Sequence, residues 1–314
     1  MKNHYLVILL LIVPIFLFSQ NTTDKVVYFD SIWKETTKEN HKFYRIIKDY
    51  YANKEFYKVF DYYKSGVLLM QGTSKTNNGN SREGEFIYYY ENGNKKKSEN
   101  YSKSRISGKF FEWYENGNPK LDGEHITSEK GLNSDIKIYQ YWDSKNEHLV
   151  IDGNGNFEEN EEERIVRGKV KNGFKDGLWT GVNNKYRYKY TDVYKKGEFI
   201  NGKSIDSSGV EREYNVLELR AMPKNGIQDF YNYVGKNFKK TPEAIQNKIT
   251  GKLIISFIIN REGKIVEPKI LKSLGYGLDE EGIRVINSYE NWIPGQQRGV
   301  TVRVLYTIPI TVTL

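Results

Sequence analysis

The sequence predicts a mainly β protein, in which a meandering antiparallel sheet of repeated β-hairpins precedes an α+β domain at the C-terminal end. Two observations predict this fold class. A short turn motif that usually ends in glycine recurs between residues 41 and 205, and aromatic runs precede several of its copies. From about residue 225 the pattern changes to two apolar strand-like segments and an amphipathic helical segment. Two different patterns in one chain predict two architectures.

Composition excludes several classes of protein. The 314 residues include no cysteine, which excludes disulfides, iron–sulfur clusters, cysteine-ligated zinc and a cysteine nucleophile. The four histidines, at positions 4, 41, 125 and 148, are far apart, and no acid–base pair or metal cluster stands out. The net charge of +8 is spread among interleaved acidic residues, so no nucleic-acid partner is expected. We therefore expect no enzyme activity, no cofactor and no metal.

The N-terminus predicts export. An uncharged, mainly apolar run extends from Tyr5 to Phe18, after a single lysine. It is shorter than the roughly 20 residues that cross a bilayer and has the length of a signal-peptide core. Residues 1–19 are expected to be a signal peptide cleaved after Ser19 or, alternatively, a retained short anchor. Either alternative places the remainder, beginning with an N-terminal segment at 20–40, in the periplasm or cell envelope.

Residues 41–205 predict a repeat array. Its turn tetrads end at positions 66, 93, 117, 145, 173 and 197, in steps of 24 to 28 residues, which is typical of stacked repeats. Asn-Gly and Lys-Gly supply the positive φ of tight strand connections, and aromatic runs such as 86–90 favour strands. A second glycine opens several units, at Gly84, Gly108 and Gly177. Each unit therefore predicts one hairpin of a meandering sheet.

These tetrads and opening glycines resemble MORN repeats, in their bacterial YwqK-like form, over about half of the chain. The resemblance implies a sheet that acts as an interaction platform, and it specifies no ligand. Residues 206–224, which follow the array, are expected to be a linker.

One segment of the array has some features of a calcium-binding loop. Asp152, Asn154, Asn156 and Glu163 provide oxygen ligands at positions 1, 3, 5 and 12 of such a loop. Phe157 occupies position 6, where the loop needs glycine, and no flanking helices are evident. A hairpin turn followed by a solvated acidic stretch is expected instead.

Residues 225–314 predict a small domain with the order strand, strand, helix, strand. The apolar run 251–259 predicts a buried strand, and a second strand follows at 264–271. Three carboxylates at 279–281 favour a helix N-terminus because they complement the helix dipole, and Gly282 would allow that helix to approach the sheet. The other expected elements are a short helix near 241–246 and a long terminal strand at 300–314.

Ordered motifs in this region resemble the TonB C-terminal domain of the energy transducer TonB family. The matching segments are Gly251, residues 260–264, 278–282, 292–295 and 306–310. The sequence departs upstream, where Thr241-Pro-Glu-Ala replaces the usual Tyr-Pro-x-x-Ala. The resemblance implies a β-β-α-β domain that holds the N-terminal peptide of an outer-membrane TonB-dependent transporter by adding it to a sheet edge.

Such β-augmentation needs an edge strand with unpaired backbone groups. The terminal strand is the expected edge, because Pro309 cannot serve a central ladder. The expected peptide-binding residues on it are Val300, Val302, Val304 and Tyr306.

The resemblance implies a transport-associated protein of the envelope whose partners are outer-membrane TonB-dependent transporters and, if the chain is anchored, inner-membrane motor proteins. A transducer must also reach across the periplasm, and only Pro119 and Pro223 lie between the signal and the C-terminal domain, so no proline-rich spacer is present. The alternative is a periplasmic scaffold. It would bind protein or cell-wall partners through the repeat sheet without transducing energy.

Overall fold

The computed structural model describes residues 23–127, 134–161 and 164–313. The expected signal peptide or anchor at 1–19 and the acidic position Glu163 lie outside the described residues. The chain divides into two compact units, one of residues 1–118 and 125–134, the other of residues 119–124 and 135–314.

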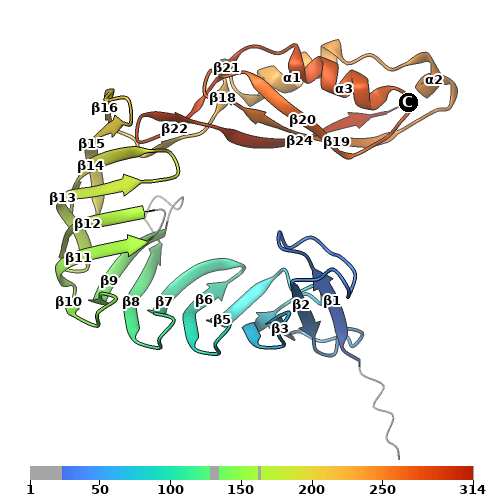
Figure 1. Ribbon diagram of the computed structural model, residues 1–314. Helices are drawn as coiled ribbons and strands as arrows, with labels where there is room; N and C mark the ends of the chain where they lie inside the picture. The colour runs from blue at the N-terminus through green and yellow to red at the C-terminus, as the bar shows by residue number, and fades with distance from the viewer. Residues whose placement is uncertain (1–22, 128–133, 162–163, 314) are drawn as a thin grey trace, which may run out of the picture. The chain divides into compact units, whose positions relative to one another are not determined.

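The first part of the chain is an antiparallel meander, as the repeats predict (Figure 1). Strands β1 to β16 lie side by side in sequence order, with neighbouring strands hydrogen-bonded to each other. In the first unit the strands are β1 (Lys25–Phe29), β2 (Phe43–Ile47), β3 (Tyr57–Tyr63), β4 (Leu68–Ser74), β5 (Arg82–Tyr89), β6 (Lys95–Ser102) and β7 (Arg105–Trp113). Strand β8 (Pro119–Thr127) has residues in both units.

In the second unit the sheet continues with β9 (Ser134–Trp142), β10 (His148–Ile151), β11 (Asn154–Glu161), β12 (Arg164–Lys171), β13 (Phe174–Asn183), β14 (Tyr188–Lys195), β15 (Glu198–Asp206) and β16 (Glu211–Tyr214). The described sheet thus begins before residue 41 and runs beyond residue 205. The segment resembling a calcium loop forms the expected hairpin turn, because Ile151 pairs with Asn154 across it.

Both the last and the first residue of the turn motif have a structural role. Gly93 and Gly117 adopt φ of 88° and 87°, a region in which side chains are strained. In two copies the tyrosine that opens the tetrad connects the turn to the next unit: the Tyr63 hydroxyl donates to the Tyr89 carbonyl and that of Tyr90 to the Trp113 carbonyl, both at 2.9 Å. The recurrence of both residues therefore follows from turn geometry and from unit-to-unit hydrogen bonding.

Aromatic rings packed over cross-strand glycines form much of the core of the sheet. Trp179 pairs with Gly168, Tyr190 with Gly181 and Tyr214 with Gly202, and each ring occupies the space that a Cβ on its glycine would need. Trp179 is 1% exposed as a result. A single sheet can bury large side chains in this way without a second layer.

The C-terminal domain consists of β17 (Glu218–Leu219), β18 (Met222–Pro223), α1 (Ile227–Asn237), α2 (Pro242–Gln246), β19 (Gly251–Ile259), β20 (Ile265–Lys272), α3 (Leu278–Asn287), β21 (Trp292–Ile293), β22 (Gly295–Gln297), β23 (Val300–Val302) and β24 (Val304–Val312). The two predicted strands, the short helix and the dipole-complemented helix are present. Helix α1 was not expected, and the residues expected as a linker contain β16, β17 and β18.

The prediction of one long terminal strand is wrong. Residues 300–302 form β23, which folds back on β22, whereas β24 pairs with β19. Residues 300–302 can fold back on β22 because Arg298 and Gly299 both have positive φ, of 48° and 73°, and close a tight hairpin between β22 and β23. The expected edge strand is therefore divided between two small sheets.

The core of this domain lies between the helices and one face of the sheet β20-β19-β24. Phe230 of α1, Phe257 of β19 and Trp292 of β21 are buried together, at 0%, 0% and 3% exposure. Gly282 of α3 permits the close approach that the sequence predicts, since a Cβ there would lie 2.6 Å from Leu253 Cδ2. The packing leaves the opposite face and the two edges of the sheet for other contacts.

Candidate peptide-binding edge

Strand β24 has a regular inward and outward alternation. Ile308, Ile310 and Val312 are buried at 1%, 7% and 3% exposure, whereas Leu305 is 69% exposed. Thr307, Pro309 and Thr311, which share its orientation, are exposed as well. The even-numbered side chains therefore pack on the core, and the odd-numbered ones lie on the open face.

The outer edge of β24 has no strand partner within the described residues. The sheet order is β20-β19-β24, so β24 pairs only with β19. That ladder runs from Gly251 opposite Val312 to Ile259 opposite Val304 without a register shift. A long, regular edge of this kind exposes backbone N–H and C=O groups that can pair with another extended chain.

Pro309 indicates which backbone groups point outward. It lies opposite Ile254 and cannot donate to the ladder, so its nitrogen belongs on the solvent side of the strand. Backbone groups of an antiparallel strand alternate between the two neighbours, so Leu305, Thr307 and Thr311 direct their N–H groups to the same side. The free rim therefore offers these donors, with a gap at Pro309.

The other edge of the sheet, β20, has features that disfavour pairing with an added strand. Its register with β19 shifts twice, and Glu267 adopts a positive φ of 53°. Pro268, Lys269 and Lys272 follow on the same strand, and the two lysines are exposed. Bulges, prolines and lysines are the usual means by which natural edges avoid added strands. Of the two edges, β24 is the one left open to a guest.

Two of the expected binding residues, Val304 and Tyr306, lie on β24, but their side chains point toward the core. The Tyr306 ring stacks on Phe257 with centroids 5.9 Å apart and meets Trp292 edge-on at 4.8 Å. Its hydroxyl donates to the carbonyl of Ala221, and burial raises the pKa of Tyr306. These residues hold the strand in place, while its outward face is formed by others.

The other two expected residues, Val300 and Val302, lie on β23. Val300 is 9% exposed and clusters with Tyr188 and Tyr190 of β14. The outward-facing residues of β24 that sequence reasoning did not name are Leu305, Thr307 and Thr311. Their signal was the two-residue period counted from Pro309, which separates them from Val304 and Tyr306.

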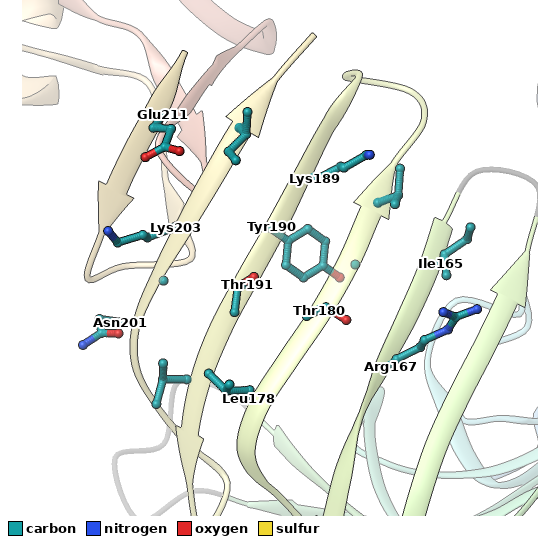
Figure 2. Close-up of a pocket in the computed structure, with 15 residues that line it drawn as sticks. Ile165, Arg167, Leu178, Thr180, Lys189, Tyr190, Thr191, Asn201, Lys203 and Glu211 are labelled. Atoms are coloured by element: carbon teal, nitrogen blue, oxygen red, sulfur yellow. The ribbon is translucent and has the colours of Figure 1, made fainter. Parts of the chain in front are cut away.

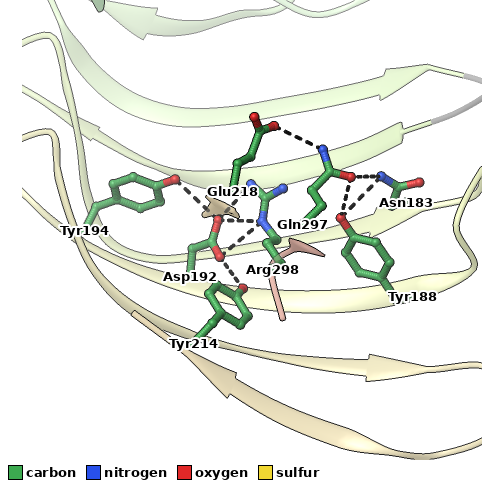
Figure 3. A network of polar contacts seen from close by, with 8 residues as sticks. All are labelled: Asn183, Tyr188, Asp192, Tyr194, Tyr214, Glu218, Gln297 and Arg298. Carbon is green, nitrogen blue, oxygen red and sulfur yellow. Dashed lines mark hydrogen bonds and ion pairs between the residues drawn. The ribbon is translucent and has the colours of Figure 1, made fainter. Parts of the chain in front are cut away.

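The β22–β23 hairpin, residues 295–302, contacts the last strands of the repeat sheet through a polar network (Figure 3). Arg298 at its tip donates from Nη2 and Nε to Asp192 Oδ2 at 3.0 and 3.1 Å. Asp192, 1% exposed, also accepts hydrogen bonds from the hydroxyls of Tyr194 and Tyr214. Burial opposes the charge on Arg298, but the hydrogen bonds and charge of Asp192 outweigh it and raise the pKa of the guanidinium.

Gln297 extends this network toward its edges. The Tyr188 hydroxyl donates to Gln297 Oε1 at 3.1 Å, and Gln297 Nε2 donates to Glu218 Oε1 at 3.3 Å. Burial raises the pKa of Tyr188, so its hydroxyl remains protonated as a donor. The hairpin is thus joined to strands β14 and β17 by neutral and charged hydrogen bonds.

A shallow cavity of about 770 Å³ lies on strands β12 to β16 (Figure 2). Its apolar lining includes Ile165, Leu178 and Val193, and Lys189 and Lys203 line it as well. No group of three His, Asp or Glu in the described part of the chain could hold a metal ion. The cavity is therefore a surface depression that combines apolar and charged side chains.

Comparison with known proteins identifies the segment that contains the candidate edge. Residues 241–314 match the family model of the Gram-negative bacterial TonB protein C-terminal. The match runs from the start of α2 through β24 and confirms the TonB-like resemblance for this segment. No curated protein matches the chain. The MORN-like resemblance of the repeat sheet stays a prediction. None of the helices among the described residues is long and apolar enough to cross a membrane.

Proposed function

We propose that this chain is a TonB-like protein of the cell envelope, in which β24 binds an extended peptide segment of outer-membrane TonB-dependent transporters during transport. The observation that carries the proposal is the contrast between the edges of one sheet. Edge β20 is protected by register shifts, proline and lysines, whereas β24 pairs regularly with β19 and is open along its other side. The TonB C-terminal match over 241–314 supports the choice of partner.

The proposed binding mode is strand addition to the rim of β24. The guest would exchange backbone hydrogen bonds with Leu305, Thr307 and Thr311, and would meet no donor at Pro309. Its side chains on the open face would contact Leu305, which is 69% exposed, and Thr307. Backbone bonds would supply most of the affinity, and these small and apolar side chains would favour an uncharged extended segment.

The test uses the whole chain as bait on solubilised outer membranes, with mass spectrometry to identify what is retained. Thr307→Pro removes one outward N–H and leaves the bonds to β19 in place, because Pro309 shows that this side of the strand tolerates proline. Thr307→Ala is the matched control, since it changes the side chain and keeps the donor. We expect wild type and Thr307→Ala to retain TonB-dependent transporters and Thr307→Pro to lose them.

Two outcomes would contradict the proposal. Equal retention by Thr307→Pro and wild type would place binding away from the β24 rim. Retention of cell-wall fragments or other periplasmic proteins, without any transporter, would favour the scaffold function of the repeat sheet.

A further inference from the structure

The tip of the β22–β23 hairpin contains a residue that its turn does not favour. Gln297 pairs with Val300, so Arg298 and Gly299 form a two-residue connection in which both residues have positive φ. Asn, Asp or Gly usually fills the first of these positions, and a long side chain there is strained. Strain of this kind persists where the surrounding structure fixes the residue, and it often marks a functional site.

The contacts of Arg298 explain why an arginine occupies this position. Its guanidinium carbon lies 3.9 Å from the centroid of the Tyr190 ring, while its nitrogens bind Asp192. Its own backbone is held as well, since Ser204 Oγ donates to the Arg298 carbonyl at 2.8 Å and the Arg298 N–H donates to the Leu217 carbonyl at 2.7 Å. A planar group that stacks and hydrogen-bonds at once cannot be replaced by lysine without loss.

The repeat sheet in turn provides a buried carboxylate that matches Arg298. Asp192 is a fully buried carboxylate on β14, and Arg298 is the cation paired with it among the described residues. The hydroxyls of Tyr194 and Tyr214 also donate to Asp192, but a buried carboxylate without a cation is strongly unfavourable, so the sheet needs Arg298 to neutralise it. Gly299 completes the fit, because a Cβ there would lie 3.2 Å from Arg212 Cβ. Each side of the contact therefore depends on the other.

The chain segment that connects the repeat sheet to the C-terminal domain would transmit tension less effectively than this contact. Residues 215–217 join β16 to β17, and β17 and β18 are two-residue strands. Tension along this route would peel β16 and then β15 from the end of the sheet, one hydrogen bond at a time. Tension through Arg298 would instead reach β14 and β15 by way of buried side chains.

We propose that the β22–β23 hairpin is a mechanical latch, which fastens the C-terminal domain to strands β14 and β15 so that tension on β24 passes into the repeat sheet through Arg298. The latch requires no guest peptide on β24. It can therefore be tested separately from the proposed function.

The experiment pulls the full chain in an optical trap. Because the chain has no cysteine, handles can be attached at two introduced ones, Lys145→Cys in the turn between β9 and β10 and Thr311→Cys on β24. We expect the first unfolding event of Arg298→Ala to occur at lower force than in wild type, followed by small steps as single strands peel away. Arg303→Ala, which removes the exposed ion pair with Glu267, should leave the first event unchanged.

Hydrogen exchange in β19 gives the check that each variant has folded. If Arg298→Ala does not fold, Arg298→Lys keeps the charge and loses the paired nitrogens, and its first unfolding force should also fall. A first unfolding force and step pattern equal to wild type in the folded variant would overturn the latch, because the load would then pass through residues 215–217.

Discussion

Replacing Gly168 by alanine should destabilise strands β12 and β13, because the added methyl group has no space. A Cβ on Gly168 would lie 2.1 Å from Cδ2 of Trp179, against at least 3.4 Å for an ordinary contact, a shortfall of 1.3 Å. The indole cannot retreat freely, since it is 1% exposed and its Nε1 donates to the Lys169 carbonyl at 3.1 Å. The φ of Gly168 is not in the left-handed region, so the clash is the main perturbation.

The free-energy cost of Gly168→Ala follows from two opposing effects. Overpacking a buried site costs about 1–3 kcal/mol. Exchanging glycine for alanine also restricts the unfolded chain, which stabilises the folded state by about 0.4–1 kcal/mol. We therefore expect a net loss of about 1–2 kcal/mol in the local free energy of opening, which is roughly a 5- to 30-fold change in the opening equilibrium.

Hydrogen-exchange mass spectrometry is the suitable assay, since it reports on β12 and β13 directly in a chain with more than one cooperative part. Gly235→Ala is the control with the opposite expected sign. Gly235 lies in helix α1 with nothing within 4 Å of a built Cβ, so alanine should slow local exchange by stabilising the helix about 0.5–1 kcal/mol. Unchanged or slower exchange of β12 and β13 in Gly168→Ala would refute the idea that the ring over the glycine is fixed in place.

Two further predictions concern single polar side chains. Burial, followed by the charge of Lys97, lowers the pKa of His125, so the unfolded chain binds its proton more readily and the first unit should lose stability as pH falls below about 6.5. Urea denaturation near pH 7.5 and 5.5, which bracket the usual histidine pKa, should show a smaller loss for His125→Phe, and equal losses would contradict this. Thr241 Oγ1 accepts from the Ala244 N–H and caps α2, so Thr241→Ala should cost about 1 kcal/mol in thermal unfolding while Thr241→Ser retains most of it. Equal melting temperatures for these two variants would argue against the cap.

The sequence was most informative where structure is dictated locally. The tetrad turns were predictable because a positive φ is a property of one residue, and glycine marks it at positions such as 93 and 117. The copy ending at Lys145 lacks glycine, yet the turn survives because Asn146 adopts φ of 65°. Asparagine tolerates that region better than most residues, so even the degraded copy retained a signal.

The terminal strand was mispredicted because its break depends on a distant partner. Val300, Val302 and Val304 alternate as one strand would, and nothing local separates the first two from the third. The partner that draws residues 295–302 away is Asp192, 106 positions earlier in the chain. Only the Arg-Gly pair at 298–299 gave a local hint, as a dipeptide able to close a hairpin.

The proposed edge strand contains two of the expected residues, Val304 and Tyr306, and its outward side chains lie one position away from them. Identifying an edge requires knowing what lies beside a strand, which the sequence expresses only through Pro309. Pro309 shows that the odd-numbered residues of β24 are the outward ones, and the two-residue period of a strand then identifies Leu305 and Thr307. Val304 and Tyr306 have the opposite parity and pack on the core.

The proposed latch and the proposed peptide-binding edge are neighbours in the chain, and a single residue separates them. Arg303 alone lies between β23, which belongs to the latch, and β24, which forms the open edge. Because a strand is nearly inextensible, a pull on a guest paired with β24 would reach β23 with little slack. The Arg303–Glu267 pair is nearer to β24, but it is exposed to solvent and contributes little resistance. The buried Arg298–Asp192 pair is therefore the first contact beyond β24 that can resist such a pull.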